Sequence, residues 1–99
     1  MIVLTATLRA RPGRRAELAA MLDAIRVDTD AEPGTLSFLV HTARDDDRTV
    51  VCYEAYADDA AMDRHREGRA VQDLMAAFGN LVDGPPEIVY LEPYSTASR

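Results

Sequence analysis

Three turns rich in proline and glycine divide this chain of 99 residues into short segments. Proline disfavours helical torsions in the residue before it, and glycine readily adopts the left-handed conformation in which helices end. A helix or strand is therefore expected to stop at each of these turns, which are Arg11-Pro12-Gly13, Glu32-Pro33-Gly34 and Gly84-Pro85-Pro86. Because a chain of this length forms one domain, we expect a single small domain without a linker or an internal repeat.

Four segments have the composition of β-strands. The first, residues 2–9, is rich in β-branched side chains and is largely apolar or neutral on both faces, which is typical of a strand covered on two sides. Residues 36–42 and 49–56 are separated by the short polar run 43–48, so they predict an antiparallel hairpin. The last strand is expected at residues 87–92.

Helical periodicity appears between these strands. Between Arg14 and about Thr29 the apolar residues gather on one face, which contains Leu18, Met21, Leu22 and Ile25. Asp58 or Asp59 is expected to cap a short helix over residues 60–66. A longer helix follows Gly68, and its apolar face contains Val71, Leu74, Met75, Phe78 and Leu81 or Val82.

The order β-α-β-β-α(α)-β predicts the α+β class and a ferredoxin-like antiparallel sheet with its helices on one face. The domain is expected to span residues 1–93, with a frayed C-terminal tail over residues 94–99. The uncovered face of the sheet carries Val3, Thr5, Thr7 and, by alternation, either Cys52, Glu54 and Tyr56 or Val51, Tyr53 and Ala55. A partly apolar face of this size is expected to be covered by a second copy in a two-fold homodimer.

The charged residues and the single cysteine exclude several classes of function. The chain carries 17 acidic and 11 basic residues, all of the latter Arg, for a formal net charge of −6. An acidic surface disfavours nucleic-acid binding, and the absence of Lys excludes Schiff-base chemistry on a side-chain amine. A lone cysteine, Cys52, and the absence of a signal-peptide pattern predict a cytoplasmic location. No apolar stretch approaches the roughly 20 residues that span a bilayer, so no membrane insertion is expected.

His65 and Glu54 are the candidate catalytic residues. His65 follows Ala61 and Met62 by four and three residues, so the three share one helical face that is expected to point inward. Imidazole transfers protons near neutral pH, although a buried histidine that hydrogen-bonds a carbonyl or Glu54 fits the same pattern. Glu54 lies in an otherwise apolar strand, where a carboxylate needs a partner. That partner is expected to be an arginine, Arg9 or Arg48, or, in a functional role, either His65 or a substrate hydroxyl.

No metal site is expected. His41 lies on the opposite side of its strand from Phe38 and Val40, which predicts a surface or interface histidine. An iron site formed by His41, His65 and Glu54 would draw its ligands from separate elements without motif spacing. The acidic run of residues 45–47 lacks the ligand pattern of a calcium loop and predicts a solvated turn.

A set of short segments recurs in a characteristic order and spacing: the three turns, Tyr53-Glu54-Ala55-Tyr56, and the single His65 in the following helix. In this order and spacing, residues 1–93 resemble the antibiotic biosynthesis monooxygenase family. The resemblance implies a dimeric α+β barrel with a pocket between sheet and helices in each subunit. Members include cofactor-independent quinol and anthrone oxygenases, haem-degrading enzymes and an isomerase of phosphorylated autoinducer-2.

The residues at the family's functional positions favour some of these activities over others. Anthrone-oxidising members carry an Asn, a Trp and a Tyr where this chain has Cys52, Tyr56 and Met62. Haem-degrading members carry an Asn on the first strand and a haem-ligating His in the last helix, where this chain has Thr7 and Met75. Glu54 and His65 match the quinol-oxidising and autoinducer-processing members. The resemblance therefore places Thr7, Cys52, Tyr56 and Met62 in the substrate pocket.

The leading functional hypothesis is a cofactor-independent monooxygenase acting with molecular oxygen on a small quinol or polyphenolic compound. His65 would remove a phenolic proton, and Glu54 would hold or tune His65. The first alternative is an isomerase of a small phosphorylated keto compound, in which Arg64, Arg66 or Arg69 would bind the phosphate. The second alternative is a small-molecule-binding dimer without catalytic activity.

Overall fold

The computed structural model describes residues 1–95, so most of the expected C-terminal tail, residues 96–99, lies outside the described residues. Its elements follow the predicted order closely. They are β1 (Ile2–Arg9), α1 (Arg15–Thr29), β2 (Thr35–Thr42), β3 (Thr49–Tyr56), α2 (Asp59–Arg66), α3 (Arg69–Leu81) and β4 (Glu87–Leu91).

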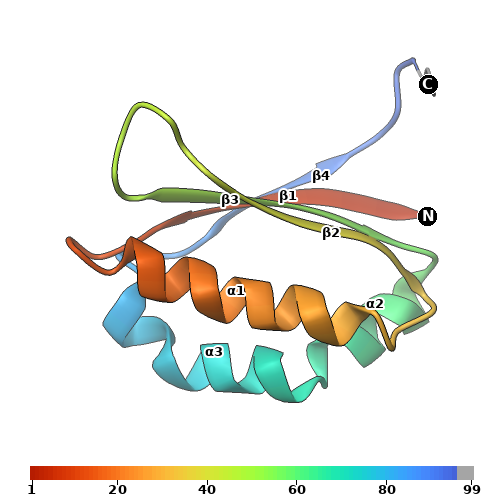
Figure 1. Ribbon diagram of the computed structural model, residues 1–99. Coiled ribbons are helices and arrows are strands. Elements are labelled where there is room, and N and C mark those ends of the chain that lie inside the picture. Colours follow the sequence, from red (N-terminus) through yellow and green to blue (C-terminus); the bar gives the residue numbers. More distant parts are fainter. Residues whose placement is uncertain (96–99) are drawn as a thin grey trace.

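The four strands form one antiparallel sheet in the order β2-β3-β1-β4. Figure 1 shows the helices together on one face of this sheet, with the other face free of helices. Helix α1 packs on β2 and β3 and against α3, whereas the short α2 lies at one end of the sheet. This is the α+β, ferredoxin-like arrangement predicted from the order of the elements.

The predicted turns end the elements for local reasons. Gly13 and Gly84 have φ values of 76° and 82°, a conformation that other residues adopt only at a cost. Asp58 is the N-cap of α2, since its side chain accepts a hydrogen bond of 2.8 Å from the backbone N–H of Ala61. These contacts fix where α2 starts and therefore which of its residues point toward the sheet.

The core lies between the sheet and the helices. It combines buried residues of the strands with one stripe of each long helix, namely Leu18, Leu22 and Ile25 from α1 and Leu74 and Leu81 from α3. Each large aliphatic side chain buried in this way contributes about 1.5 to 3 kcal/mol. Met75 departs from the expected pattern, because it is 63% exposed rather than part of the core or a pocket wall.

The structure decides which residues of β3 face the helices. Val50, Cys52 and Tyr56 are buried in the core, so Glu54, which alternates with them, is on the same side. The opposite side of β3 carries Val51, Tyr53 and Ala55, the second of the two expected sets. We call this side of the sheet the open face; it includes Val3, Thr5, Thr7, Leu39, Val51, Tyr53, Ala55, Val89 and Leu91.

No helix within residues 1–95 has the length and apolar character needed to cross a membrane.

Candidate active site

The imidazole of His65 is buried where α2 meets the sheet. Its side chain is one of the inward-facing residues of α2, together with Ala61 and Met62, as the spacing predicted. Its Nδ1 lies 2.9 Å from Oε1 of Glu32, a residue of the turn between α1 and β2. His65 therefore has a carboxylate partner, but that partner is Glu32 and not Glu54.

Two aromatic rings enclose the imidazole. The ring of Phe38 from β2 and that of Tyr56 from β3 lie with their centroids 5.3 and 5.1 Å from the centre of the imidazole ring, both tilted relative to it. These spacings are typical of packed aromatic pairs, which favour one orientation of the ring. Side chains from β2 and β3 thus restrict the orientation of the imidazole ring.

Glu54 is hydrogen-bonded to Tyr56. The phenol of Tyr56 donates a bond of 2.5 Å to Oε1 of Glu54. Burial raises the pKa of Glu54 above its ordinary value, while the hydrogen bond from Tyr56 and the nearby His65 and Arg66 oppose that rise. Burial and the adjacent carboxylate also raise the pKa of Tyr56, so the phenol keeps its proton.

The expected arginine partners of Glu54 are occupied elsewhere or exposed. Arg48 donates to Oδ2 of Asp83 at 2.8 Å and to the backbone carbonyl of Ala10. Arg9 is exposed at the end of β1. The arginine whose charge lowers the pKa of Glu54 is Arg66, which lies on α2 and not on a neighbouring strand.

Gly34 allows the turn with Glu32 to approach α2. A Cβ added to Gly34 would lie 2.5 Å from Cβ of Ala61, well inside van der Waals contact. The turn Glu32-Pro33-Gly34, predicted as the end of a helix, therefore also packs closely against α2.

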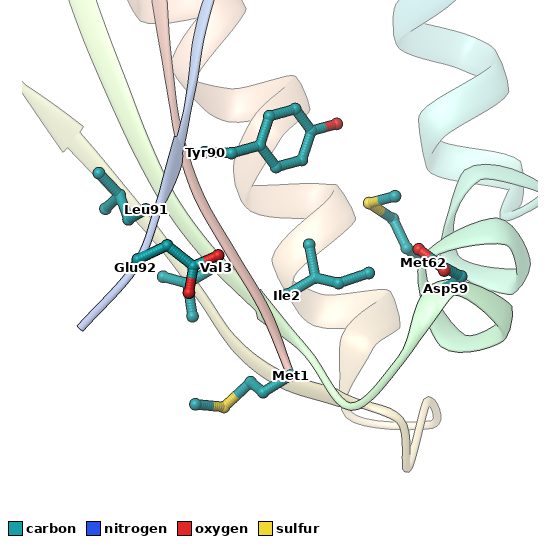
Figure 2. A pocket seen from close by; sticks show the side chains of 8 residues that line it. All are labelled: Met1, Ile2, Val3, Asp59, Met62, Tyr90, Leu91 and Glu92. Atoms are coloured by element: carbon teal, nitrogen blue, oxygen red, sulfur yellow. The ribbon is translucent and has the colours of Figure 1, made fainter.

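A surface pocket of about 370 Å³ opens beside this cluster, between α2 and the strands β1 and β4 (Figure 2). In Figure 2 the side chains of Ile2 and Tyr90 point from the strands toward Met62 on α2. The lining residues are Met1, Ile2, Val3, Asp59, Met62, Tyr90, Leu91 and Glu92. The wall that faces α2 is thus mainly apolar and contains one aromatic ring.

Strand register places this pocket next to the polar cluster. Ile2 is the partner of Tyr56 across β1 and β3. Leu4 is paired with Glu54 on one side and with Tyr90 on the other. Met62 belongs both to the pocket and to the face of α2 that carries His65. Residues of the lining therefore neighbour the cluster, whose own members are not part of the lining.

The predicted substrate-binding residues divide between the two faces of the sheet. Met62 lines the pocket and Tyr56 belongs to the cluster beside it. Cys52 is fully buried on the same side, and burial raises the pKa of its thiol to about 12, so it is not a nucleophile at neutral pH. Thr7 lies on the open face with its strand partners Val51 and Glu87, so the structure does not bring it to His65.

His41 is likewise remote from His65. It is exposed on the open face, near the end of β2, with Nδ1 3.3 Å from the carbonyl oxygen of Val51. An iron site of His41, His65 and Glu54 cannot form, because the sheet separates the first residue from the other two. Among residues 1–95, no cluster of three or more His, Cys, Asp or Glu side chains is arranged to hold a metal ion.

Comparison with known sequences gives an independent assignment. Residues 1–77 match the model of the family described as antibiotic biosynthesis monooxygenase. The chain is 31% identical over 97 residues to "Putative monooxygenase Rv0793" of Mycobacterium tuberculosis, which covers 98% of this chain and 95% of that protein. It is 28% identical over 92 residues to "Putative monooxygenase YcnE" of Bacillus subtilis, covering 93% of this chain and 97% of that one.

Solved structures agree with the sequence comparison. The structure of Rv0793 matches with a TM-score of 0.84 over 98% of each chain. That of PA3566 from Pseudomonas aeruginosa, at 28% identity, matches with a TM-score of 0.87 over 95% of this chain and 94% of that chain. The resemblance noted in the sequence is thereby confirmed: the chain belongs to the antibiotic biosynthesis monooxygenase family.

Proposed function

We propose that this protein is a cofactor-independent monooxygenase that oxidises a small quinol or polyphenolic compound with molecular oxygen. The observation that carries the proposal is the buried His65, bonded through Nδ1 to Glu32, near a pocket with both apolar and acidic lining residues. A carboxylate only accepts hydrogen bonds, so Nδ1 carries the proton and the lone pair on Nε2 is available to accept one. That atom is the general base of the proposed reaction.

The reaction needs a base, an oriented substrate and exclusion of water. Removal of a phenolic proton by Nε2 leaves an electron-rich anion, which transfers one electron to oxygen and forms a radical pair with superoxide. Recombination at a ring carbon that carries two hydrogens in the keto tautomer gives a hydroperoxide. Loss of water then leaves a carbonyl, so one oxygen atom enters the product and the other leaves as water.

The pocket suits such a substrate. Its volume of about 370 Å³ is at the small end of ligand sites, which typically hold about 300 to 1,000 Å³. Tyr90 offers a ring for stacking, and Ile2 and Met62 offer apolar contact. Asp59, Tyr90 and Glu92 in the lining can hydrogen-bond a hydroxyl, and the pair of Glu54 and Tyr56 lies on β3, the neighbour of β1.

The charge of the pocket favours a quinol over a phosphorylated substrate. Its lining includes two carboxylates, Asp59 and Glu92, and no arginine. These carboxylates disfavour a phosphate dianion, and Arg66, whose Nη2 contacts the Met62 sulfur at 3.7 Å, is not among the lining residues. The isomerase of a phosphorylated keto compound is therefore the weaker alternative, and Arg64 and Arg69 do not line the pocket.

We further propose that two copies associate through their open faces in a homodimer. Four large side chains on this face, Leu39, Tyr53, Val89 and Leu91, are between 37% and 48% exposed. An apolar surface spread over all four strands favours a partner with the same surface. A reduced, buried Cys52 fits the proposed cytoplasmic location.

Oxygen uptake tests the proposed activity, and the two histidines of the chain provide matched variants. The metal-free protein is mixed with a panel of quinols, and His65→Gln is compared with His41→Gln. We expect His65→Gln to lower the rate by about 100-fold or more, the usual contribution of a general base. His41→Gln should leave the rate unchanged.

Three results would count against the proposal. Equal rates for His65→Gln and the unaltered protein would remove His65 as the base. Complete absence of uptake, with quinol binding retained, would favour the non-catalytic alternative. Activity that requires bound iron or haem would contradict cofactor independence.

A further inference from the structure

We propose that Glu32 is the positioning residue of this site: it fixes His65 in the tautomer with the proton on Nδ1 and keeps Nε2 free to act as the base. The catalytic part of this inference rests on the proposed function. The geometric part is independent of it, because the tautomer of His65 is a property of the folded chain without substrate.

The contact between the two residues defines which nitrogen is engaged. Nδ1 of His65 lies 2.9 Å from Oε1 of Glu32. Every buried polar side-chain atom within residues 1–95 has a hydrogen-bond partner. Nε2 makes no hydrogen bond in that range, so it belongs to the small exposed part of a side chain that is otherwise buried. Among these residues, Nε2 is therefore the nitrogen without a protein partner, and it is the one left to accept a proton.

The carboxylate of Glu32 is itself held in place. The hydroxyl of Thr35 donates a bond of 2.8 Å to the same Oε1 that accepts from His65. The backbone N–H of Thr35 donates to the carbonyl of Glu32 at 3.0 Å, and that of Glu32 donates to the carbonyl of Thr29 at 2.9 Å. This turn thus presents an oriented acceptor before any substrate binds, which is what a positioning group requires.

The charges around His65 leave Glu32 as its carboxylate partner. Glu54 faces the imidazole from β3, but it accepts the hydrogen bond of Tyr56. Arg66, one residue further along α2, acts on Glu54 and Tyr56. Arg64 lies beside the same turn as Glu32, close to the position of Gly34. A negative charge opposite Nδ1 also stabilises the imidazolium that forms when Nε2 takes a proton.

The first test observes the tautomer by ¹⁵N and ¹³C NMR of the imidazole in the full chain. In the unaltered protein at a pH where His65 is neutral, we expect the proton on Nδ1. Glu32→Ala should return His65 to a mixture dominated by the Nε2–H form that free imidazole prefers. Glu67→Gln, an exposed change two residues after His65, should leave the spectrum unchanged. A proton on Nε2 in the unaltered protein overturns the inference without any variant.

The second test measures turnover of a quinol with oxygen. Glu32→Gln keeps an acceptor oxygen but removes the charge, so we expect kcat to fall about 10- to 100-fold, the size of effect typical for an orienting partner. KM should change by less than about threefold because the substrate does not touch Glu32. Thr35→Val, which removes the hydroxyl that holds Oε1, should lower kcat by a smaller factor and serves if the Glu32 variants unfold.

The two tests separate the possible failures. Unchanged kcat in Glu32→Gln and Thr35→Val, with folding intact, overturns the positioning role. A rise in KM alone would make Glu32 a binding residue and also overturn it. Absence of turnover in the unaltered protein refutes the proposed function, whereas the NMR result still decides the geometry of Glu32 and His65.

Discussion

The two faces of the sheet at strand β3 differ in how they treat polar and apolar groups. On the helix side, Glu54 is paired with Tyr56, and His65 is paired with Glu32. On the open face, Tyr53 is partly exposed and its neighbours across the sheet, Leu39 and Thr5, are also left uncovered by helices. The same strand therefore contributes to a polar cluster whose groups are hydrogen-bonded and to an apolar surface that no helix covers.

This difference links the proposed site to the proposed interface. Side chains alternate along β3, so the register that points Glu54 and Tyr56 at the helices also points Val51 and Tyr53 away from them. A shift of one residue would exchange the two sets. The chemistry of one face and the association of the other are therefore fixed by the same hydrogen-bond register, and they meet at Val3 and Leu91, which belong both to the open face and to the pocket lining.

The largest expected effect is on association through the open face. Thr5 is paired with Tyr53 and with Val89, at the centre of that face. In a face-to-face dimer, Thr5→Glu would bury a charge near its symmetry mate, which should weaken association by on the order of 100-fold or more. Sedimentation equilibrium measures the dissociation constant. Thr42→Glu, at the exposed end of β2, is the control that should leave the dimer intact.

Thr5→Glu also tests whether the two faces of the sheet act independently, because Thr5 lies on the open face and His65 on the helix side. The NMR signals of His65 in Thr5→Glu should retain the proton on Nδ1. A protein that sediments as a monomer before any substitution would contradict the shared-sheet arrangement.

The next largest effect is a loss of stability caused by overpacking between the Glu32 turn and α2. Gly34→Ala would place a Cβ 2.5 Å from Cβ of Ala61, so either the turn or α2 must move. Overpacking of this kind costs about 1 to 3 kcal/mol, which urea denaturation measures as a lower midpoint. Turnover should fall as well, since the displacement separates Glu32 from His65, while dimerisation should persist.

Gly79→Ala is the matched control, for which we expect a gain in stability in the same urea denaturation experiment. Gly79 lies within α3, and an added Cβ would meet no atom within 4 Å. Alanine is the better helix former, so this variant should gain up to about 1 kcal/mol. Equal destabilisation by both substitutions would show that close approach at Gly34 is not the cause.

The smallest effect concerns the cost of burying Glu54. Burial raises the pKa of Glu54 above the value of 4.5 that an unperturbed carboxyl has. The folded chain therefore binds this proton more tightly than the unfolded chain, and stability falls as pH rises from the unfolded pKa through the folded one. Glu54→Gln removes that loss and can still accept the bond from Tyr56.

We expect Glu54→Gln to have a higher melting temperature than the unaltered protein at about pH 7, with the difference shrinking toward about pH 4. Thermal melts at a series of pH values measure it. A variant that is less stable at pH 7 would show that the bond from Tyr56 and the charges of His65 and Arg66 outweigh burial.

The elements and the inward face of α2 were predictable from the sequence. Pro33 and Gly34 end α1, Asp58 caps α2, and helical spacing alone groups Met62 with His65. The orientation of β3 was not predictable, because both of its alternating sets mix apolar and polar side chains, so burial of neither is favoured by hydrophobicity. The structure resolves it through the packing of Cys52 and Tyr56 against the helices.

The partner of His65 was also beyond sequence reasoning. Glu32 is 33 positions away, and only the packing of its turn against α2 brings the two together. Thr7 shows the converse error: a position inferred from family resemblance lies on the face that the helices do not cover. Periodicity describes one element at a time, whereas a site is made by contacts between elements.

The most direct test of the account asks where a quinol binds. The chain has four methionines, and they lie in different places: Met1 and Met62 line the pocket, Met21 is packed against the core, and Met75 is exposed on α3. We propose titrating hydroquinone, without oxygen, into protein labelled with ¹³C at the methionine methyls. Saturable shifts of Met62 and Met1, with Met21 and Met75 unchanged, are the predicted result. Saturable shifts confined to Met75 or Met21 would contradict a substrate site beside His65.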